Sequence, residues 1–377
     1  MKSVLNILCF LSLTTAASAC NIPVFRYALE RWSPDSSDIV VFHSSPLTDA
    51  QQRSVQNLQS DDANAKVSAQ ATDEPMDDSI ALLWDDLSKQ SDLQLPYVVV
   101  RSSVAGTQVN GWRGSLAEAE TAHLLSSPVR EELSKRLLSG HSAVWLVLKS
   151  NDAARNNEVT SLLQKELKRL SNEIPLPEGI GLPGSELFSE IPLLMRFSVL
   201  EIDPADTDER FLASLLNGFE PDSIANGQPL VVPVFGRGRA LEVIPAEQVN
   251  AGLIEDLTLF LCGACSCQVK ERNPGFDLLI SAKWETELFG EDAEAMATKF
   301  STEEEEIGLP VLLEIPSGKT DNDAEAIPRA EDSPIANEAV AQAAVRQEPD
   351  STSGIAWLIG LLSVFVAGLA VSHSMKS

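Results

Sequence analysis

Positive charge is scarce in this sequence. Its 377 residues include 28 lysines and arginines against 55 aspartates and glutamates, which gives a formal net charge of −27 at pH 7. Such a chain repels the phosphate backbone of nucleic acids, so we exclude non-specific nucleic-acid binding. The excess of carboxylates indicates a well-solvated surface; the alternative is an acidic surface that attracts cations or a basic partner.

Catalytic motifs and histidines are scarce as well. The sequence has no Gly-x-Ser-x-Gly, His-Glu-x-x-His or phosphate-loop motif. His43, His123 and His141 are scattered and none has a second obvious ligand nearby. We therefore expect them to be surface or strand-end residues rather than catalytic bases.

Long apolar runs occur only at the two ends. Lys2 supplies a positive charge, Val4 to Leu13 an apolar segment and Ala17 to Ala19 a small-residue cleavage site. This order predicts a secretory signal peptide over residues 1–19, with the mature chain starting at or near Cys20. The protein is therefore expected in the periplasm or an equivalent exported space.

The second apolar run, Ile355 to Val371, carries no charge and is just long enough to cross a bilayer as one helix. An acidic segment precedes it and Lys376 follows it, which is the weak positive-inside pattern of an exported body with a short cytoplasmic tail. We predict a single-pass anchor over residues 354–372, a tail over 373–377 and a disordered acidic tether over 317–353.

The first half of the body has a mixed helix and strand pattern. β-Branched and aromatic runs predict strands, and caps followed by periodic apolar residues predict helices. The strands are expected at Asp38–His43 and Pro96–Arg101, and the helices from Thr48 to Leu58, at Ile80–Leu87, at Leu116–Leu125 and from Pro128 to Leu138. Ser60 to Asp78 is acidic and poor in large apolar residues, so we expect a loose insertion there.

The second half has a clearer pattern. A continuous apolar run predicts a buried central strand, and Asp152 is placed to cap the helix that follows. The expected order is strand Ala143–Leu148, helix from Asp152 to Leu170, a loop rich in proline and glycine over Pro175–Pro192, strand Met195–Ile202, helix Asp208–Asn217, strand Leu230–Phe235, a turn at Gly236–Gly238, strand Arg239–Ile244 and helix Ala246–Leu261. Beyond them we expect a turn and a strand in the stretch from Asn273 to Trp284 and a strand at Leu309–Ile315. Trp112, Trp145 and Trp284 are assigned to cores.

The order of strand, helix, strand, helix, hairpin and final helix over about residues 140–261 resembles the thioredoxin-like fold. Pro229, just before a strand, stands where that family places its cis-proline, and Gly236 to Gly238 matches its hairpin turn, with the arginines of the turn expected in solvent. Pro233 departs from the pattern, because a proline inside a strand lacks a ladder donor and indicates an edge or a bulge. The first half resembles a second, incomplete unit of the same kind.

The resemblance implies a Cys-x-x-Cys at the start of the helix that follows the first central strand, where the helix dipole lowers the thiol pKa. The corresponding residues here are Ser150 to Ala153 in the second half and Ser44 to Pro46 in the first. Neither site has a cysteine, so the resemblance argues against ordinary oxidoreductase activity.

The cysteines lie elsewhere. Cys9 leaves with the signal peptide, which gives a mature chain with Cys20 and a cluster of Cys262, Cys265 and Cys267 at the end of the last helix. An even number in an exported protein favours two structural disulfides, such as one within the cluster and one from Cys20 to it. The alternatives are a copper or zinc site, a labile redox pair, and a lipid-modified Cys20.

The sequence thus predicts a signal-bearing, membrane-anchored α/β protein. Its body would comprise an N-terminal α/β domain (20–139), a thioredoxin-like domain ending in the cysteines (140–267) and an extension (268–316). The function we expect is binding or assembly with a protein partner, without catalysis and with no cofactor. The alternative is a thiol-disulfide or copper- and zinc-handling protein in which Cys262, Cys265 and Cys267 act.

Overall fold

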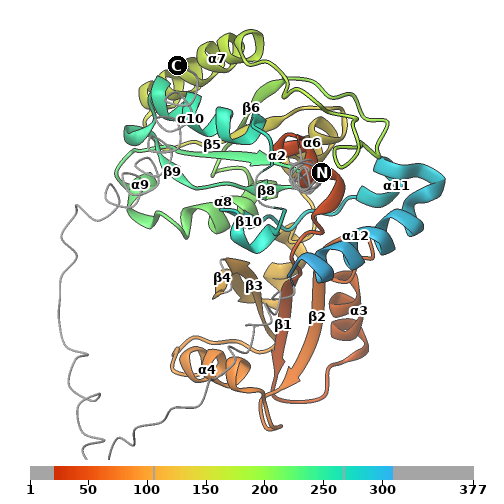
Figure 1. The fold of residues 1–377 in the computed structure, drawn as a ribbon. Helices are drawn as coiled ribbons and strands as arrows, with labels where there is room; N and C mark the ends of the chain where they lie inside the picture. Colours follow the sequence, from red (N-terminus) through yellow and green to blue (C-terminus); the bar gives the residue numbers. More distant parts are fainter. Residues whose placement is uncertain (1–20, 105–106, 266–267, 309–377) are drawn as a thin grey trace, which may run out of the picture. The chain divides into compact units, whose positions relative to one another are not determined.

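The computed structural model describes residues 21–104, 107–265 and 268–308, which belong to one compact unit of the chain (Figure 1). Within these ranges no helix is both long and apolar enough to cross a membrane. The predicted signal peptide, acidic tether, membrane helix and strand at Leu309–Ile315 lie outside the described residues, so they remain predictions.

One mixed sheet runs through the described residues in the order β2-β1-β3-β10-β8-β7-β5-β6, with β4 paired to β3 and β9 to β7. The α/β class expected from the sequence is therefore confirmed. The strands are β1 (Ser37–His43), β2 (Ala65–Ala71), β3 (Tyr97–Val104), β4 (Thr107–Ser115), β5 (Ala143–Leu148), β6 (Phe197–Ile202), β7 (Leu230–Phe235), β8 (Arg239–Ala240), β9 (Ile244–Pro245) and β10 (Phe276–Asp277).

The two halves of the sheet have the same strand arrangement. In the first half β1 is parallel to β2 and antiparallel to β3, and β3 is antiparallel to β4. In the second half β5 is parallel to β6 and antiparallel to β7, and β7 is antiparallel to β8. β10 pairs with both β3 and β8 and so joins the two halves.

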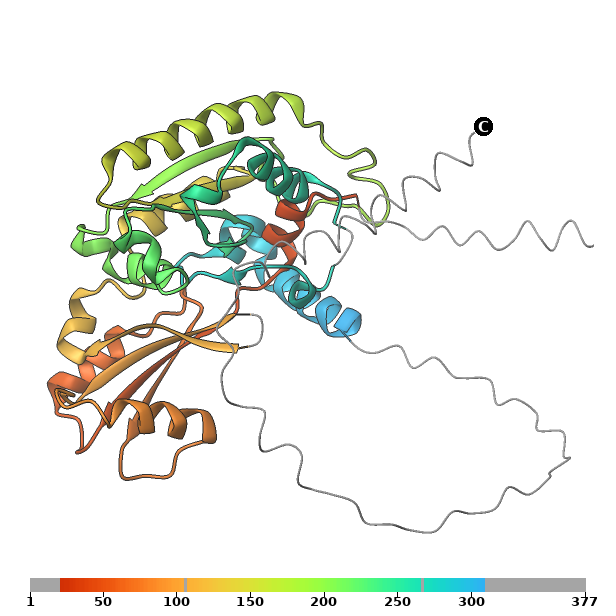
Figure 2. The ribbon, with the colours of Figure 1, turned by 90° about the vertical axis from the view of Figure 1, so that its left-hand side faces the viewer.

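Helices cover both faces of this sheet. They are α2 (Val24–Arg31), α3 (Asp49–Asn57), α4 (Asp78–Leu87), α5 (Leu116–Thr121), α6 (Pro128–Leu138), α7 (Ala153–Glu173), α8 (Arg210–Asn217), α9 (Pro221–Ala225), α10 (Ala251–Cys262), α11 (Trp284–Phe289) and α12 (Ala293–Gly308). Short 3₁₀ turns lie at Thr207–Glu209, Ala246–Gln248, Lys270–Arg272 and Gly290–Asp292. Figures 1 and 2 show the second half of the sheet between α7 and α10 on one side and α8 on the other.

The alternation of side chains along β5 builds two cores. Val144, Leu146 and Leu148 belong to an apolar cluster with α6 and α8, whereas Trp145 and Val147 pack in a second cluster with α2, α7 and α10. The first of these clusters continues beneath β1 and β3 of the first half. Because one core underlies both halves, separating them would expose apolar surface to water. The core positions predicted for Trp112, Trp145 and Trp284 are confirmed.

The strongest local signals in the sequence are confirmed. Thr48 caps α3 with a reciprocal capping box that includes Gln51, and Asp152 caps α7. Pro128 opens α6, and Gly140, with a φ of +93°, follows its end.

The loose insertion predicted at Ser60 to Asp78 is wrong in its centre, where β2 forms. Every residue of β2 pairs in parallel with β1. β2 lies at the end of the sheet and its side chains are exposed or half-buried, so small and polar residues suffice. An edge strand of this kind lacks the large apolar residues by which we recognised the other strands.

The hairpin of the second half also differs from the prediction. The strand expected at Arg239–Ile244 is split into β8 and β9, and the interruption lies opposite Pro233. The Pro233 carbonyl accepts a hydrogen bond from Leu241 N at 2.9 Å. Proline has no backbone N–H to donate, and here this lack coincides with the gap between β8 and β9, where the ladder is already interrupted. Among the described residues the cis peptide bond is Leu95–Pro96, before β3, and Pro229 is not cis.

The arginines of the hairpin turn are buried rather than solvated. Arg237 donates to Leu29 O at 2.9 Å and to Glu30 O at 3.0 Å, and Arg239 lies 3.2 Å from the carboxylate of Asp277. A Gly-Arg-Gly sequence is typical of an exposed turn, and only the packing of α2 and β10 against this one buries its charges.

A buried charge cluster holds β10 in place. Lys270 Nζ lies 2.6 Å from Asp277 Oδ2 and 2.7 Å from Asp35 Oδ1, and Asp35 N donates to Asp277 at 2.6 Å. The side chains of Lys270, Asp277 and Arg239 are 4%, 4% and 6% exposed, so water screens these contacts little. The cluster connects the hairpin, β10 and the segment before β1.

We expect Asp277→Ala to destabilise the fold by about 3–5 kcal/mol, because Arg239 then loses its carboxylate partner and Lys270 keeps only the more exposed Asp35. Urea unfolding followed by tryptophan fluorescence measures this free energy. Asp85→Ala is the control, since it breaks a salt bridge to Lys89 whose side chains are 69% and 68% exposed. Coincident unfolding curves for wild type and Asp277→Ala would contradict the role of the cluster.

Candidate functional site

The two described cysteines of the cluster are buried in an apolar core. Cys262 ends α10 and Cys265 follows it, and they are 2% and 3% exposed. No disulfide joins one to the other. Burial raises the pKa of the Cys262 thiol to about 12. A neutral, buried thiol at a helix C-terminus is a poor nucleophile.

The chain near the mature N-terminus lies beside this cluster. Cys265 N donates to Ile22 O at 2.8 Å, Val24 N donates to Gly263 O at 3.0 Å, and Pro23 forms an antiparallel bridge with Ala264. These contacts place residues 22–24 beside residues 263–265.

Cys20 and Cys267 lie outside the described residues, so the bridge between Cys20 and the cluster remains a prediction. The predicted metal set of Cys262, Cys265 and Cys267 is only partly described. Across residues 21–104, 107–265 and 268–308, no group of three or more histidines, cysteines or carboxylates could hold a metal ion.

The start of α7, where the resemblance noted in the sequence predicts a dithiol, is occupied by polar residues bonded to the protein itself. Ser150 Oγ donates to Gly227 O at 2.9 Å. The Asp152 carboxylate accepts from Ala154 N at 3.0 Å and Arg155 N at 3.1 Å. Two of the free donors of the helix end are thus bonded to a carboxylate of the protein, and the negative charge there disfavours a bound anion.

The corresponding position of the first half is the segment between β1 and α3. His43 Nδ1 lies 3.0 Å from Ser45 O, and Thr48 with Gln51 satisfies the start of α3. Neither helix start has a group suited to disulfide exchange.

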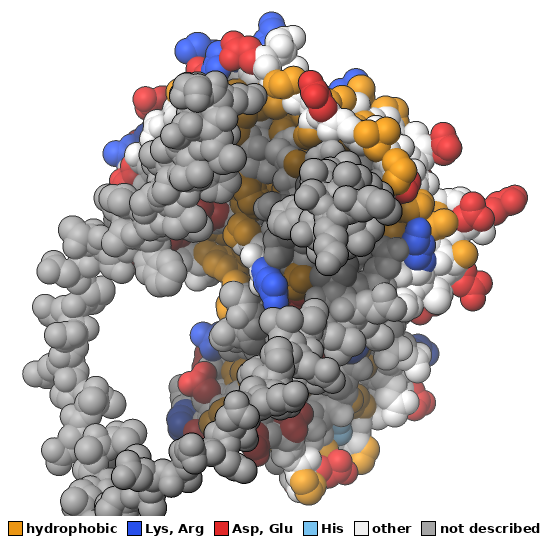
Figure 3. Space-filling model, in the orientation of Figure 1, with side chains coloured by type: hydrophobic (Ala, Val, Ile, Leu, Met, Phe, Trp, Pro, Cys, Tyr) orange, Lys and Arg blue, Asp and Glu red, His pale blue; other side chains and the backbone are white. Residues whose placement is uncertain are grey.

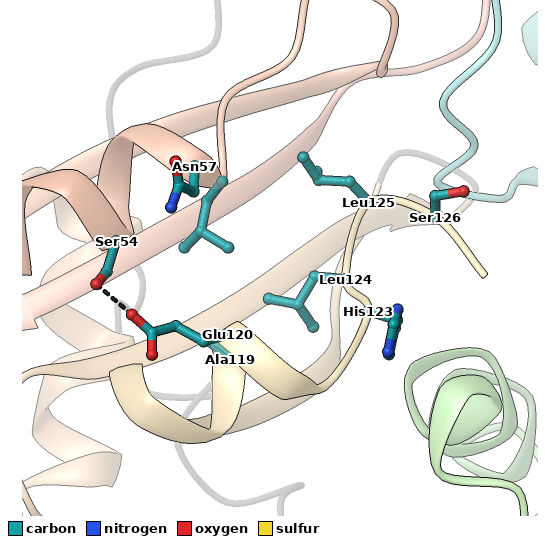
Figure 4. Close-up of a pocket in the computed structure, with 9 residues that line it drawn as sticks. Ser54, Asn57, Ala119, Glu120, His123, Leu124, Leu125 and Ser126 are labelled. Atoms are coloured by element: carbon teal, nitrogen blue, oxygen red, sulfur yellow. Dashed lines mark hydrogen bonds between the residues drawn. The ribbon is translucent and has the colours of Figure 1, made fainter.

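A pocket of about 330 Å³ lies between α3 and α5, and Figure 4 shows its lining. Ser54 donates a hydrogen bond to Glu120, and both side chains line the pocket. The His123 ring turns away from this pair, and its Nε2 lies 3.3 Å from Asp208 Oδ1. Because serine and histidine do not meet, the pocket lacks a paired nucleophile and base.

The three histidines have different partners, as their scattered positions in the sequence lead us to expect. His43 bonds to a loop carbonyl, His123 meets Asp208, and His141 Nδ1 lies 2.9 Å from Arg136 O. Burial lowers the pKa of His141. The three lie at separate places and share no partner.

A long ordered loop over residues 174–196 connects α7 to β6. The sequence predicts the loop from its prolines and glycines, but it does not show how the loop is held. Glu30 accepts from Ser189 N at 3.1 Å, Arg26 donates to Ser189 O at 2.7 Å and Asn21 N donates to Ser185 Oγ at 2.9 Å. The isolated charges of α2 gave no signal of this role, since their partners are more than 150 residues away.

No family model matches the chain, and no curated protein is significantly similar to it.

We expect Cys262 to make stability fall at alkaline pH. The pKa of its thiol in the folded protein, about 12, exceeds the ordinary value of 9.0. The contribution of the thiol to the free energy of unfolding is therefore complete below pH 9 and is lost as pH rises from 9 towards 12. Between pH 8 and 10.5, wild type should lose roughly 2 kcal/mol more than Cys262→Ala in urea unfolding. Equal losses in the two proteins would contradict the burial of a neutral thiol.

Proposed function

We propose that the protein is a membrane-anchored, exported binding or assembly module, built from two thioredoxin-like units that both lack the catalytic dithiol. Its work would be to hold a protein partner rather than to exchange disulfides. No cofactor is needed for this role.

The strand arrangement supports the thioredoxin-like part of the proposal. Each half has a parallel strand pair joined by a helix, then a second helix, an antiparallel hairpin and a closing helix. In the first half these are β1, α3, β2, α4, β3, β4 and α5. In the second half they are β5, α7, β6, α8, β7, β8 with β9, and α10, with the short helix α9 added between α8 and β7. β2 gives the first half a strand that the sequence did not predict, parallel to β1 as β6 is to β5.

One observation carries the non-catalytic part. Both helix starts at which such a fold presents its dithiol lack cysteine, and at α7 the Asp152 carboxylate already occupies the end of the helix. A carboxylate there also disfavours a thiolate by like-charge repulsion.

The alternative is redox or copper handling by the cysteine cluster. The burial of Cys262 and Cys265 and the raised pKa of Cys262 weigh against it, because a metal ligand or nucleophile acts as the thiolate. The anchored and exported parts of the proposal rest on the apolar runs at Val4–Leu13 and Ile355–Val371.

We expect the purified full chain not to accelerate the reduction of insulin disulfides by dithiothreitol. The rate with the protein should equal the rate with the reductant alone. The described cysteines, Cys262 and Cys265, lie at the C-terminal end of α10, and neither of them is at a helix N-terminus from which it could attack these disulfides. Turbidity from the precipitating insulin B chain measures the rate, with thioredoxin as the positive control.

A double variant, Ser150→Cys with Ala153→Cys, tests the fold assignment separately. If α7 matches the helix of a thioredoxin active site, the two new thiols should form a disulfide that peptide mapping detects. Reduction of insulin by the wild-type chain would overturn the non-catalytic proposal. Failure of the new pair to oxidise would count against the thioredoxin-like assignment alone.

A further inference from the structure

Apolar side chains are exposed at one end of the second half. Among the residues that the structure describes, five large apolar side chains are exposed, and one of them, Leu82, stands alone on α4. The other four, which we call the apolar end, are Leu176 (41% exposed), Leu182 (60%), Leu259 (46%) and Phe260 (39%). Leu176 and Leu182 belong to the loop after α7, and Leu259 and Phe260 to the last turn of α10.

Contacts between α7, α10 and the N-terminal segment bring these segments together. The first half of α7 lines a pocket with residues 246–249, which precede α10, and Arg169 of α7 bonds to Glu255 of α10 at 2.7 Å. The two helices therefore run in the same direction and end together. Gly179 of the loop lies against Asn21 and Leu182, since a Cβ at Gly179 would stand 2.6 Å from Asn21 Nδ2 and 3.7 Å from Leu182 Cδ1. The next residue after Asn21, Ile22, accepts a hydrogen bond from Cys265, which follows α10.

Figure 3 shows the result on one face of the molecule. Hydrophobic side chains gather over the loop that follows α7, with acidic side chains at their border. Loops longer than about 15 residues without helix or strand are uncommon and are usually functional or disordered. This loop is ordered, so its exposed leucines need an explanation.

The loop is fixed from below by a buried ion pair. Arg26 Nε lies 2.9 Å from Glu30 Oε1, with the two side chains 1% and 0% exposed. The same carboxylate accepts from Phe188 N at 3.2 Å and Ser189 N at 3.1 Å, and Arg31 donates to Glu186 O at 2.9 Å. The charges of α2 thus hold residues 186–189, the part of the loop that follows Leu182. A surface ordered before binding loses less conformational entropy when a partner arrives.

The charges around the apolar end select the kind of partner. The two segments that form the apolar end also carry exposed carboxylates, which are Glu178, Glu186 and Glu190 in the loop and Asp256 in α10. Hydrogen bonds from backbone amides, its own and that of Gly184, lower the pKa of Glu186, so it is ionised. The cations nearest to Glu186 are Arg31 and Lys299, and both lie over the ring of Phe188.

This acidic border repels anionic lipid headgroups and disfavours a bilayer as the occupant. A second copy of the chain would bring a like-charged border against it. A protein segment with an apolar centre and lysine or arginine flanks matches both features.

We propose that the apolar end is a preformed docking surface for a protein segment that inserts apolar side chains between Leu176, Leu182, Leu259 and Phe260 and places basic residues on the acidic border. The inference rests on the proposed function as a binding module and names the surface and the chemistry of the partner.

The test presents the purified full chain to a displayed library of random short peptides. We expect selection of peptides with aromatic or aliphatic centres and lysine or arginine flanks. Leu182→Ser and Phe260→Ser should each weaken the selected peptides by roughly tenfold or more, as truncation of a central contact does. Leu82→Ser is the matched control and should bind as wild type. All three replaced side chains are exposed, and superimposable thermal melts would establish that the variants fold.

The charge part has its own readout. Glu178→Gln with Glu186→Gln should weaken the same peptides, and raising the salt concentration should do so as well. The proposal is overturned if no selected peptide distinguishes Leu182→Ser from Leu82→Ser, or if the selected peptides lack basic flanks. A dimer of the chain that Leu182→Ser dissociates would make a second copy the occupant and also overturn it. The insulin assay is independent of these results, so a failure here is distinguishable from a failure of the proposed function.

Discussion

The interaction on which the described structure depends is the buried carboxylate of Asp277 between Lys270 and Arg239. β10 is only two residues long, yet it pairs with β3 on one side and β8 on the other. Two residues of ladder contribute little by themselves. The charge cluster fixes the strand in register, and the apolar core that crosses from the first half to the second then packs beneath it. Without that strand, the halves would be two sheets with an unsatisfied edge facing each other.

α2 plays a second connecting role through charge. Its last residues receive hydrogen bonds from Arg237 of the hairpin turn, and its Glu30 carboxylate receives the amides of the loop after α7. Arg237 also lies 2.6 Å from Glu285 of α11. One short helix thus connects the hairpin, the C-terminal helices and the apolar end. A surface that binds by shape needs a backbone of this rigidity, as the binding role proposed above requires.

The sequence was most informative where local chemistry decides the outcome. Apolar runs such as Ala143–Leu148 predicted the central strand, and capping residues such as Thr48 and Asp152 predicted helix starts. It failed where tertiary pairing decides: β2 has the composition of a loop and forms because β1 offers it a parallel edge. The arginines of the hairpin turn were predicted to be solvated. The prediction failed because the partners that bury Arg237 lie more than 200 residues away in the chain. For the same reason the apolar end was not foreseen. Its loop and α10 are remote in sequence, and no local pattern marks their meeting.

The central claim is that the loop after α7 is held in one conformation by the buried pair of Arg26 and Glu30. Hydrogen exchange of backbone amides in the full chain, resolved to single residues, measures this most directly. The account predicts that the amides of Phe188 and Ser189, which donate to Glu30, exchange as slowly as those of β5, and that Glu30→Gln speeds both. Exchange of these two amides in wild type at the rate of an unfolded chain would contradict it.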